Sequence, residues 1–294
     1  MNQFYTFIFV LISLPLFSQK KVDLKYKFQN TDIYTVTTNI TSQSMQEVAG
    51  SPQDVSTNQQ IFYTLTITEI PSDVNYHLNV KFNKISSLVN QSGQKQFFSS
   101  DSSNNQVSKI FKHFLTKELN FQLSKKGKKI PLFTINKLFS DSSEESQKYI
   151  FSQSVEQKIT GDLPVSIIFP DTSISPGNSW SVQDTLTSGI FNFYNKTYTL
   201  DSISEKNYFI SEKSDFSSDK NKLIPMNRVF ISYNIKGTAE NKFVLDKLSC
   251  IIKEGLIKQF GTGSVNMLYT KNSEPAYTWD MTVNNIVKLK TSKQ

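Results

Sequence analysis

Apolar and polar side chains alternate along most of this sequence, and this two-residue period limits the fold more than any other feature. It is clearest over residues 61–67 and 76–82, where every second residue is apolar: Ile61, Tyr63, Leu65 and Ile67, then Tyr76, Leu78, Val80 and Phe82. Successive side chains of a strand point to opposite faces of a sheet, so the pattern predicts antiparallel strands with one buried face. The sequence lacks the strand–helix–strand spacing of a parallel sheet. The expected fold is mainly β with minor α.

Two stretches break this period and predict helices. Residues 105–118 carry apolar side chains at helical spacing, with Asn104 or Asn105 as the cap. The other face of this segment is basic, so it could lie on a membrane surface, but we favour the interpretation that its apolar face covers the sheet. Residues 142–158 follow a stretch that resembles a capping box and form the second expected helix.

The two halves of the chain carry similar patterns in the same order, which predicts an internal duplication. The best pair joins "FQLSKKGKKI", from Phe121, to "FVLDKLSCII", from Phe243, with the same Phe-x-Leu-x-Lys spacing. We expect a first β-rich half over residues 19–160 and a second over 161–294. Each half would supply a curved antiparallel sheet, and the two related sheets would form half-barrels or a sandwich.

Trp180 follows the Pro176–Gly177 turn and allows two interpretations. It could be an aromatic contact residue in a binding loop, or it could open the first strand of the second half. Weaker sequence pairs align Tyr63 with Tyr198 and Tyr34 with Trp180. This alignment favours the second interpretation, in which Trp180 is inward and structural.

The first residues are apolar from Phe4 to Phe17, a run that suits the core of a signal peptide. We expect residues 1–18 to be removed and the rest to be exported to the periplasm or the cell exterior; an uncleaved membrane anchor is the alternative. Once the signal is removed, we do not expect an integral membrane protein. Cys250 is the single cysteine, so there is no internal disulfide, and its apolar neighbours predict a small buried side chain.

The formal net charge is +7, but Arg228 is the sole arginine among 32 basic residues. Proteins that read nucleic acids favour Arg for its bidentate geometry, so this balance argues against a nucleic-acid partner. The lysine excess is typical of a solvated surface that is attracted to anionic components of a cell envelope.

The sequence does not point to a catalytic constellation, a metal site or a cofactor. His77 and His113 are isolated on polar faces, and Cys250 has no evident partner. Carboxylate pairs remain possible acid–base groups if two of them meet across a cleft. The candidates are Asp171, Asp184, Asp201, Asp246 and Asp280. Asp246 is better explained as the opening of a hairpin turn.

Several stretches together resemble an uncharacterised domain family of exported proteins from Bacteroidota-type bacteria. They are "KYKFQNTDIYTVTTNIT", "LSKKGKKI", "FPDTSISPGNSWS" and "IKGTAENKFVLDKLSCIIKEGLIKQFGTG". The resemblance implies no activity and no site residues. By looser analogy, such sheets resemble the half-barrels of lipoprotein carriers, which hold acyl chains in an apolar concavity.

Three hypotheses about function follow. The leading one is a non-enzymatic envelope protein that binds an apolar or amphipathic ligand, or a protein partner, through a curved β-sheet. The second is a structural or interaction module of the cell surface. The third is a hydrolase that uses a carboxylate pair, which requires at least one carboxyl group with a raised pKa.

Overall fold

A computed structural model describes residues 21–48, 51–70, 75–131, 166–185, 191–226 and 228–294. The elements are β1 (Asp32–Val48), β2 (Ser51–Glu69), β3 (Asn75–Gln91), β4 (Gln94–Ser99), α1 (Gln106–Phe114), β5 (Glu118–Ser124), β6 (Lys129–Pro131), β7 (Ser179–Thr185), β8 (Phe191–Ile203), β9 (Asn207–Ser218), β10 (Ile224–Met226), β11 (Val229–Asp246), β12 (Ile252–Leu268) and β13 (Tyr277–Lys293). The expected signal peptide (1–18) and the expected helix near 142–158 lie outside the described residues.

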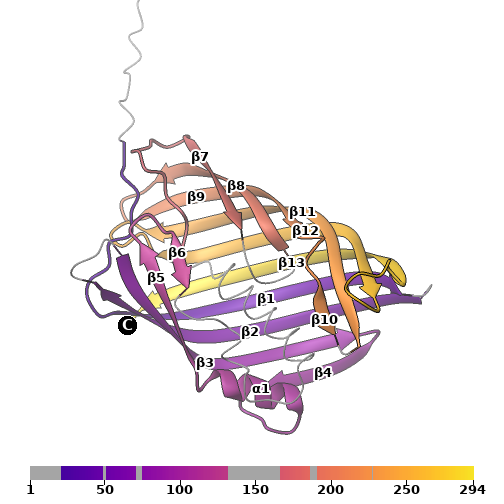
Figure 1. The fold of residues 1–294 in the computed structure, drawn as a ribbon. Helices are drawn as coiled ribbons and strands as arrows, with labels where there is room; N and C mark the ends of the chain where they lie inside the picture. The colour runs from indigo at the N-terminus through magenta and orange to yellow at the C-terminus, as the bar shows by residue number, and fades with distance from the viewer. Residues whose placement is uncertain (1–20, 49–50, 71–74, 132–165, 186–190, 227) are drawn as a thin grey trace, which may run out of the picture.

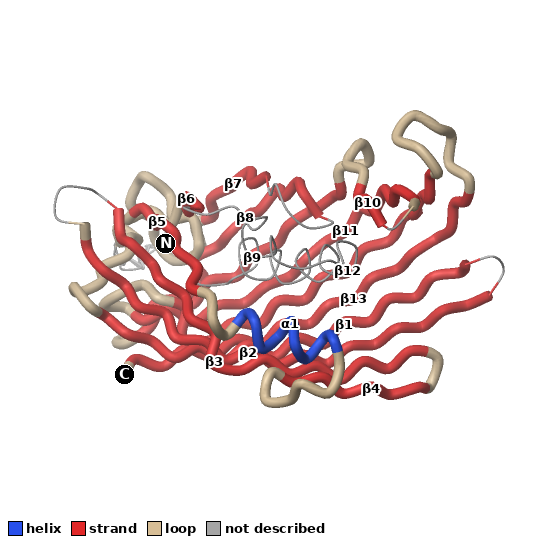
Figure 2. The backbone as a smooth tube through the Cα atoms, turned by 60° about the horizontal axis from the view of Figure 1, so that its bottom comes forward, coloured by secondary structure: helices blue, strands red, loops and turns tan. Residues whose placement is uncertain are grey.

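All of these strands belong to one antiparallel sheet of 13 strands, which confirms the mainly β class (Figure 1). The order across it is β6-β5-β3-β2-β1-β13-β12-β11-β9-β8-β7, with β4 beside β3 and β10 beside β11. Figure 2 shows that the sheet curves into an open trough, with α1 along one side. The right-handed twist of long strands produces such curvature in a sheet of this width.

The expectation of two separate sheets is wrong, because β1 and β13 join the two halves of the chain. They pair from Tyr34 opposite Lys293 to Gln46 opposite Met281. In this register the buried residues of one strand lie opposite buried residues of the other, for example Ile40 opposite Val287. The pairing therefore buries apolar side chains, and it also removes two open strand edges. On either side of this joint the strands follow one another as a meander. The duplication itself stays a prediction.

The main core lies on the inner face of the trough near one end of the strands. Two irregular segments, 22–28 and 166–174, cross this face and are linked by backbone hydrogen bonds between Val22 and Ile174. The fully buried Tyr26 accepts a hydrogen bond from the Ile167 N–H at 2.7 Å. The apolar phases of β1, β2, β3 and β5 supply the opposite wall of the core.

The helix expected over residues 105–118 is confirmed as α1, but it ends earlier, at Phe114, and residue 118 already begins β5. The Asn105 side chain caps it by accepting a hydrogen bond from the Ser108 N–H at 2.8 Å. Phe111 and Phe114 are buried, and the Phe114 ring meets Phe82 of β3 edge to face. The apolar side of α1 therefore covers the sheet, as we favoured.

Trp180 is the second residue of β7, which begins two residues after Gly177 with its positive φ of 85°. Its ring stacks on Tyr198 at 5.3 Å between centroids, and Nε1 donates a hydrogen bond to the Ile168 carbonyl at 2.8 Å. The side chain packs against the main core. The inward, structural interpretation of Trp180 is confirmed.

Two further expectations concern the membrane and the cysteine. Within the described ranges, we find no helix with both the length and the apolar character needed to cross a membrane. Cys250 is a buried free thiol, as expected, and burial raises its pKa to about 11.

Candidate ligand-binding cavity

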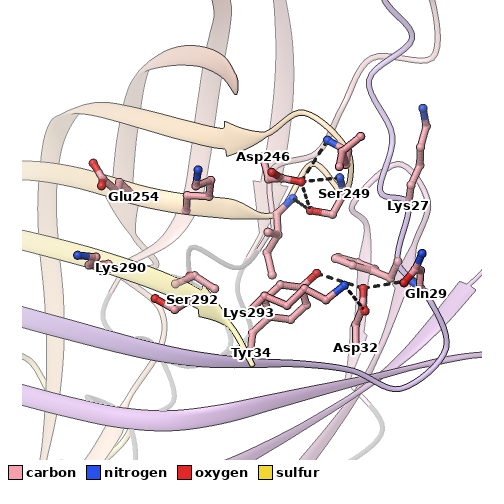
Figure 3. A pocket seen from close by; sticks show the side chains of 15 residues that line it. Lys27, Gln29, Asp32, Tyr34, Asp246, Ser249, Glu254, Lys290, Ser292 and Lys293 are labelled. Carbon is pink, nitrogen blue, oxygen red and sulfur yellow. Dashed lines mark hydrogen bonds and ion pairs between the residues drawn. The ribbon is translucent and has the colours of Figure 1, made fainter. Parts of the chain in front are cut away.

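A cavity of about 730 Å³ opens at one end of the trough (Figure 3). It lies where β11 ends, β12 begins, β13 ends and β1 begins, next to the irregular segment around Phe28. Its lining is Lys27, Phe28, Gln29, Asp32, Tyr34, Asp246, Leu248, Ser249, Ile251, Lys253, Glu254, Lys290, Thr291, Ser292 and Lys293. This volume is within the range of about 300–1,000 Å³ that is usual for small-molecule sites.

The cavity exists because the ladder between β12 and β13 ends early. That ladder stops at Glu254 opposite Lys290, whereas β13 continues along β1 as far as Lys293. The last three residues of β13 therefore have a strand partner on one side only. Next to this gap, β12 carries a bulge, because Val244 and Leu245 of β11 lie opposite Glu254 and Ile252 and leave Lys253 as the extra residue.

A rigid turn over residues 247–251 forms one wall of the cavity. The Asp246 carboxylate accepts hydrogen bonds from the Leu248 N–H, the Ser249 N–H and the Ser249 hydroxyl, at 2.9–3.1 Å. Cys250 closes the turn with a positive φ of 60° and donates its N–H to the Asp246 carbonyl at 2.7 Å. The expectation that Asp246 opens a hairpin turn is confirmed.

The floor of the cavity is apolar. Phe28, Tyr34 and Ile251 are all buried, and the Phe28 and Tyr34 rings meet edge to face at 6.3 Å between centroids. Burial raises the pKa of the Tyr34 hydroxyl, so it is neutral at physiological pH. An apolar group could pack on this floor without leaving an unpaired charge behind.

One buried carboxylate beside the apolar floor, that of Asp32, is held by several donors. Asp32 pairs with Lys293 at 2.6 Å and accepts hydrogen bonds from the Gln29 N–H and the Tyr34 hydroxyl, both at 3.1 Å. Burial works to raise the pKa of Asp32, but these hydrogen bonds and the Lys293 charge outweigh it, and the pKa is lowered. Asp32 is therefore a structural anion.

The remaining cations of the cavity are unpaired. Among the described residues, no carboxylate lies within ion-pair distance of Lys27, Lys253 or Lys290. Lys253 donates a hydrogen bond to the Asn207 side-chain oxygen, at 3.3 Å. Figure 3 shows Lys293 turned to Asp32, whereas Lys27 and Lys290 point away from Asp32 and Asp246. The cavity thus combines an apolar floor with a basic rim.

A second groove of about 490 Å³ adjoins the cavity and shares Glu254 and Lys290 with it. Its apolar lining residues are Phe209, Ile210, Phe243, Val244, Leu256 and Leu289. The apolar surface at this end of the sheet therefore extends beyond the first cavity.

The sequence candidates for acid–base chemistry do not gather at one place. Asp184 pairs with Lys196 at 3.0 Å, and Asp201 accepts a hydrogen bond from Ser211 at 2.8 Å. Asp171 and Asp280 are exposed, so only Asp246 of the five lines the cavity.

The two histidines also lie apart. His77 lies beside the Asn120 side chain at 3.0 Å, and His113 lies on α1. No cluster of potential metal ligands occurs in the part of the chain that the structure describes.

Sequence reasoning missed most of the cavity. Lys27, Asp32 and Lys293 were not singled out, and they lie on segments at opposite ends of the chain. No local motif connects them. The available signal was indirect: lysines at the ends of the alternating segments, close to the one turn that was expected to begin with Asp246.

The fold and the cavity define a class of protein: a single curved antiparallel sheet with an amphipathic cavity at one end of its strands. The chain belongs to a family of unknown function, DUF6263, whose model matches residues 73–252. This match covers most of the chain and includes the turn over residues 247–251. No curated protein has a matching sequence.

Among solved structures, the chain is similar to one titled "Lipid-protein interactions in lipovitellin", with a TM-score of 0.53 and 11% identity. The similarity covers 91% of this chain and 26% of lipovitellin, so the chain spans about a quarter of that protein's length. It shows the fold alone. An outer membrane channel from Pseudomonas putida F1 matches over 91% of this chain and 97% of its own, but with 6% identity and a TM-score of 0.28.

Proposed function

We propose that the protein is a non-enzymatic binder of a single amphipathic anion, which occupies the cavity at the end of the sheet. The apolar part of the ligand packs on Phe28, Tyr34 and Ile251, and its anionic group meets a lysine of the basic rim. Lys27, Lys253 and Lys290 supply that rim. The observation that carries the proposal is the combination of an apolar floor with unpaired lysines in one cavity of about 730 Å³. Ligand sites are commonly built in this way, from apolar walls and a few polar groups.

The place of action is also a proposal. The apolar run from Phe4 to Phe17 supports export of the chain to the periplasm or the cell exterior. An exported binder of this kind would hold an amphipathic molecule whose apolar part is costly to leave in water.

Two of the three carboxylates that line the cavity, Asp32 and Asp246, are poorly suited to hydrolysis. A carboxyl group that acts as a general acid needs a raised pKa, whereas that of Asp32 is lowered. The Asp246 carboxylate is already occupied by three donors of its own turn.

Binding of dodecanoate, compared with dodecanol, tests the proposal. The two probes share an apolar chain and differ in charge, so we expect dodecanoate to bind about tenfold more tightly, as measured by calorimetry. The double variant Lys27→Gln/Lys253→Gln keeps only Lys290 of the three rim lysines, so it should lose most of this preference while still binding the apolar chain. Lys236→Gln, an exposed lysine of β11 outside the cavity, is the control and should keep it.

Equal affinity for the two probes, or an unchanged preference in the double variant, would contradict the proposal. Failure of both probes to bind, together with a stable protein complex recovered by crosslinking in cells, would favour the interaction module instead.

A further inference from the structure

Two turns and one irregular segment lie side by side at the end of the trough that carries the cavity. Lys247 joins the turns, because its N–H donates to the Lys206 carbonyl at 2.9 Å and its Nζ donates to the Ser204 carbonyl at 2.8 Å. On the other flank, the Lys27 N–H donates to the Ser249 carbonyl at 3.1 Å. The turn between β8 and β9, the turn between β11 and β12, and the segment around Lys27 therefore form one surface, which we call the turn face.

Leu248 stands out from the turn face. It is 81% exposed, more than any other large apolar side chain that the structure describes. The three hydrogen bonds to Asp246 and the closure at Cys250 fix the turn, so Leu248 is held in this position. A single exposed leucine is ordinary on a protein surface, and its surroundings decide what it means.

The surroundings of Leu248 are basic. In the described part of the chain, five lysines of this region make no ion pair with a carboxylate: Lys27, Lys206, Lys247, Lys253 and Lys290. Asp201, Glu205 and Glu254 are exposed carboxylates among them. The turn face therefore combines one projecting apolar side chain with an excess of free positive charge.

The opposite end of the sheet provides a contrast within the same molecule. It also exposes apolar side chains, of which Tyr269 is 60% exposed. Its hairpins over residues 45–54 and 267–280 are mostly acidic, with Glu47, Asp54, Glu274 and Asp280 beside Lys271. The other turns of this end add Asp219 and four basic residues, namely Lys95, Lys220, Lys222 and Arg228. Acidic and basic side chains are therefore mixed at this end, and an anionic surface would be attracted more strongly to the turn face.

We propose that the turn face docks on an anionic lipid bilayer, with Leu248 entering the boundary between headgroups and acyl chains and the lysines contacting lipid phosphates. Basic residues around an apolar side chain are the usual means by which a protein binds such a surface reversibly. Docking does not depend on the proposed ligand. If both proposals hold, the cavity opens at the bilayer, because Leu248, Lys27 and Lys253 also line it.

A dye that reports local polarity tests this contact. Leu248→Cys places the dye on the turn face and Tyr269→Cys places it at the opposite end, both in the full chain. The unchanged protein gives the labelling blank, since the buried Cys250 thiol with its pKa of about 11 should not react. With phosphatidylglycerol vesicles we expect a blue shift at position 248 and none at 269.

Charge variants test the second half of the proposal. Lys206→Glu, outside the cavity, should weaken vesicle binding at least about fivefold, whereas Lys236→Glu on β11 should leave it unchanged. The signal at position 248 should also fade as salt is added, because screening weakens attraction between exposed charges.

An equal response at positions 248 and 269, an equal response to neutral phosphatidylcholine vesicles, or no response to either vesicle would overturn docking. A response at 248 to an envelope protein but not to vesicles would overturn it in favour of a protein partner. Loss of dodecanoate binding with an intact vesicle response would count against the proposed function alone.

Discussion

At the scale of single residues, three glycines allow the cost of backbone strain to be compared with the cost of a steric collision. Gly127 has a φ of +91°, and a Cβ there would collide with the Ile167 carbonyl oxygen. Gly93 has a similar φ of +86° with no atom nearby, and Gly255 has ordinary φ and ordinary contacts. The first joins the turn after β5 to the irregular segment that fills the core.

Gly127→Ala should lower the free energy of unfolding by about 3 kcal/mol, because it combines backbone strain with a collision against backbone. Gly93→Ala should cost about 1 kcal/mol for strain alone, and Gly255→Ala should change stability by less than about 0.5 kcal/mol. Urea unfolding of the three variants gives the comparison. Equal losses for Gly127→Ala and Gly93→Ala would show that the contact with Ile167 is unimportant.

Asp32 makes stability depend on pH in a defined direction. Its pKa is lowered in the folded protein, so the unfolded chain binds the proton more readily. The stability that it contributes is fully present above the unfolded pKa of about 4 and is lost as pH falls through the lower folded pKa. Asp32→Asn should therefore flatten the decline of unfolding free energy below about pH 4, measured by urea titrations at several pH values. A variant curve parallel to that of the unchanged protein would contradict this.

At the scale of elements, the bulge in β12 connects the sheet to the cavity. Ile252 is buried on the inner face and Glu254 is exposed, so these two residues alternate as direct neighbours in a regular strand would. Lys253, which lies between them, is therefore the extra residue of the bulge. The bulge places a cationic side chain at the gap beside β13. It is a small change in the ladder with a direct effect on the proposed site.

Deletion of Lys253 should restore a regular ladder and keep both flanking residues on their present faces. We expect the unfolding free energy to change by less than about 1 kcal/mol, and dodecanoate affinity to fall about fivefold. Lys253→Gln keeps the bulge and removes the charge, so it is the matched comparison. Dodecanoate binding as tight as that of the unchanged protein would show that the bulge plays no part in the site.

The elements also show how far sequence reasoning reached. Alternation predicted the strands, and the spacing of Phe111 and Phe114 predicted α1, because both signals are local. The β1–β13 pairing was missed, since nothing in the pattern of either strand specifies which partner it takes. The cavity was missed for the same reason: Lys27, Asp246 and Lys293 meet only after distant strands have paired.

At the scale of the whole molecule, β13 is the strand that makes two meanders into one sheet. It pairs with β1 on one side and with β12 on the other. A chain that ends at Ser273 lacks both ladders and leaves the edges of β1 and β12 open. Open edges of long strands promote association between chains.

That shortened chain should form aggregates and show no cooperative unfolding transition, by size-exclusion chromatography and circular dichroism. Removal of Gln294 alone is the control, because this residue supplies only hydrogen bonds to Ile33 and Thr35. A monomeric, cooperatively folding chain without β13 would mean that the first meander is stable by itself.

The pairing of β1 with β13 also constrains the order in which contacts can form while the chain is synthesised and folds. Tyr34 cannot meet Lys293 until almost the entire chain has been synthesised, so the central joint of the sheet is among the last contacts that can form. Contacts so distant in sequence slow folding, because a long loop must close before they yield any stability. During synthesis the chain therefore remains without its final architecture, and a cellular factor that needs an unfolded polypeptide has that whole interval in which to engage it.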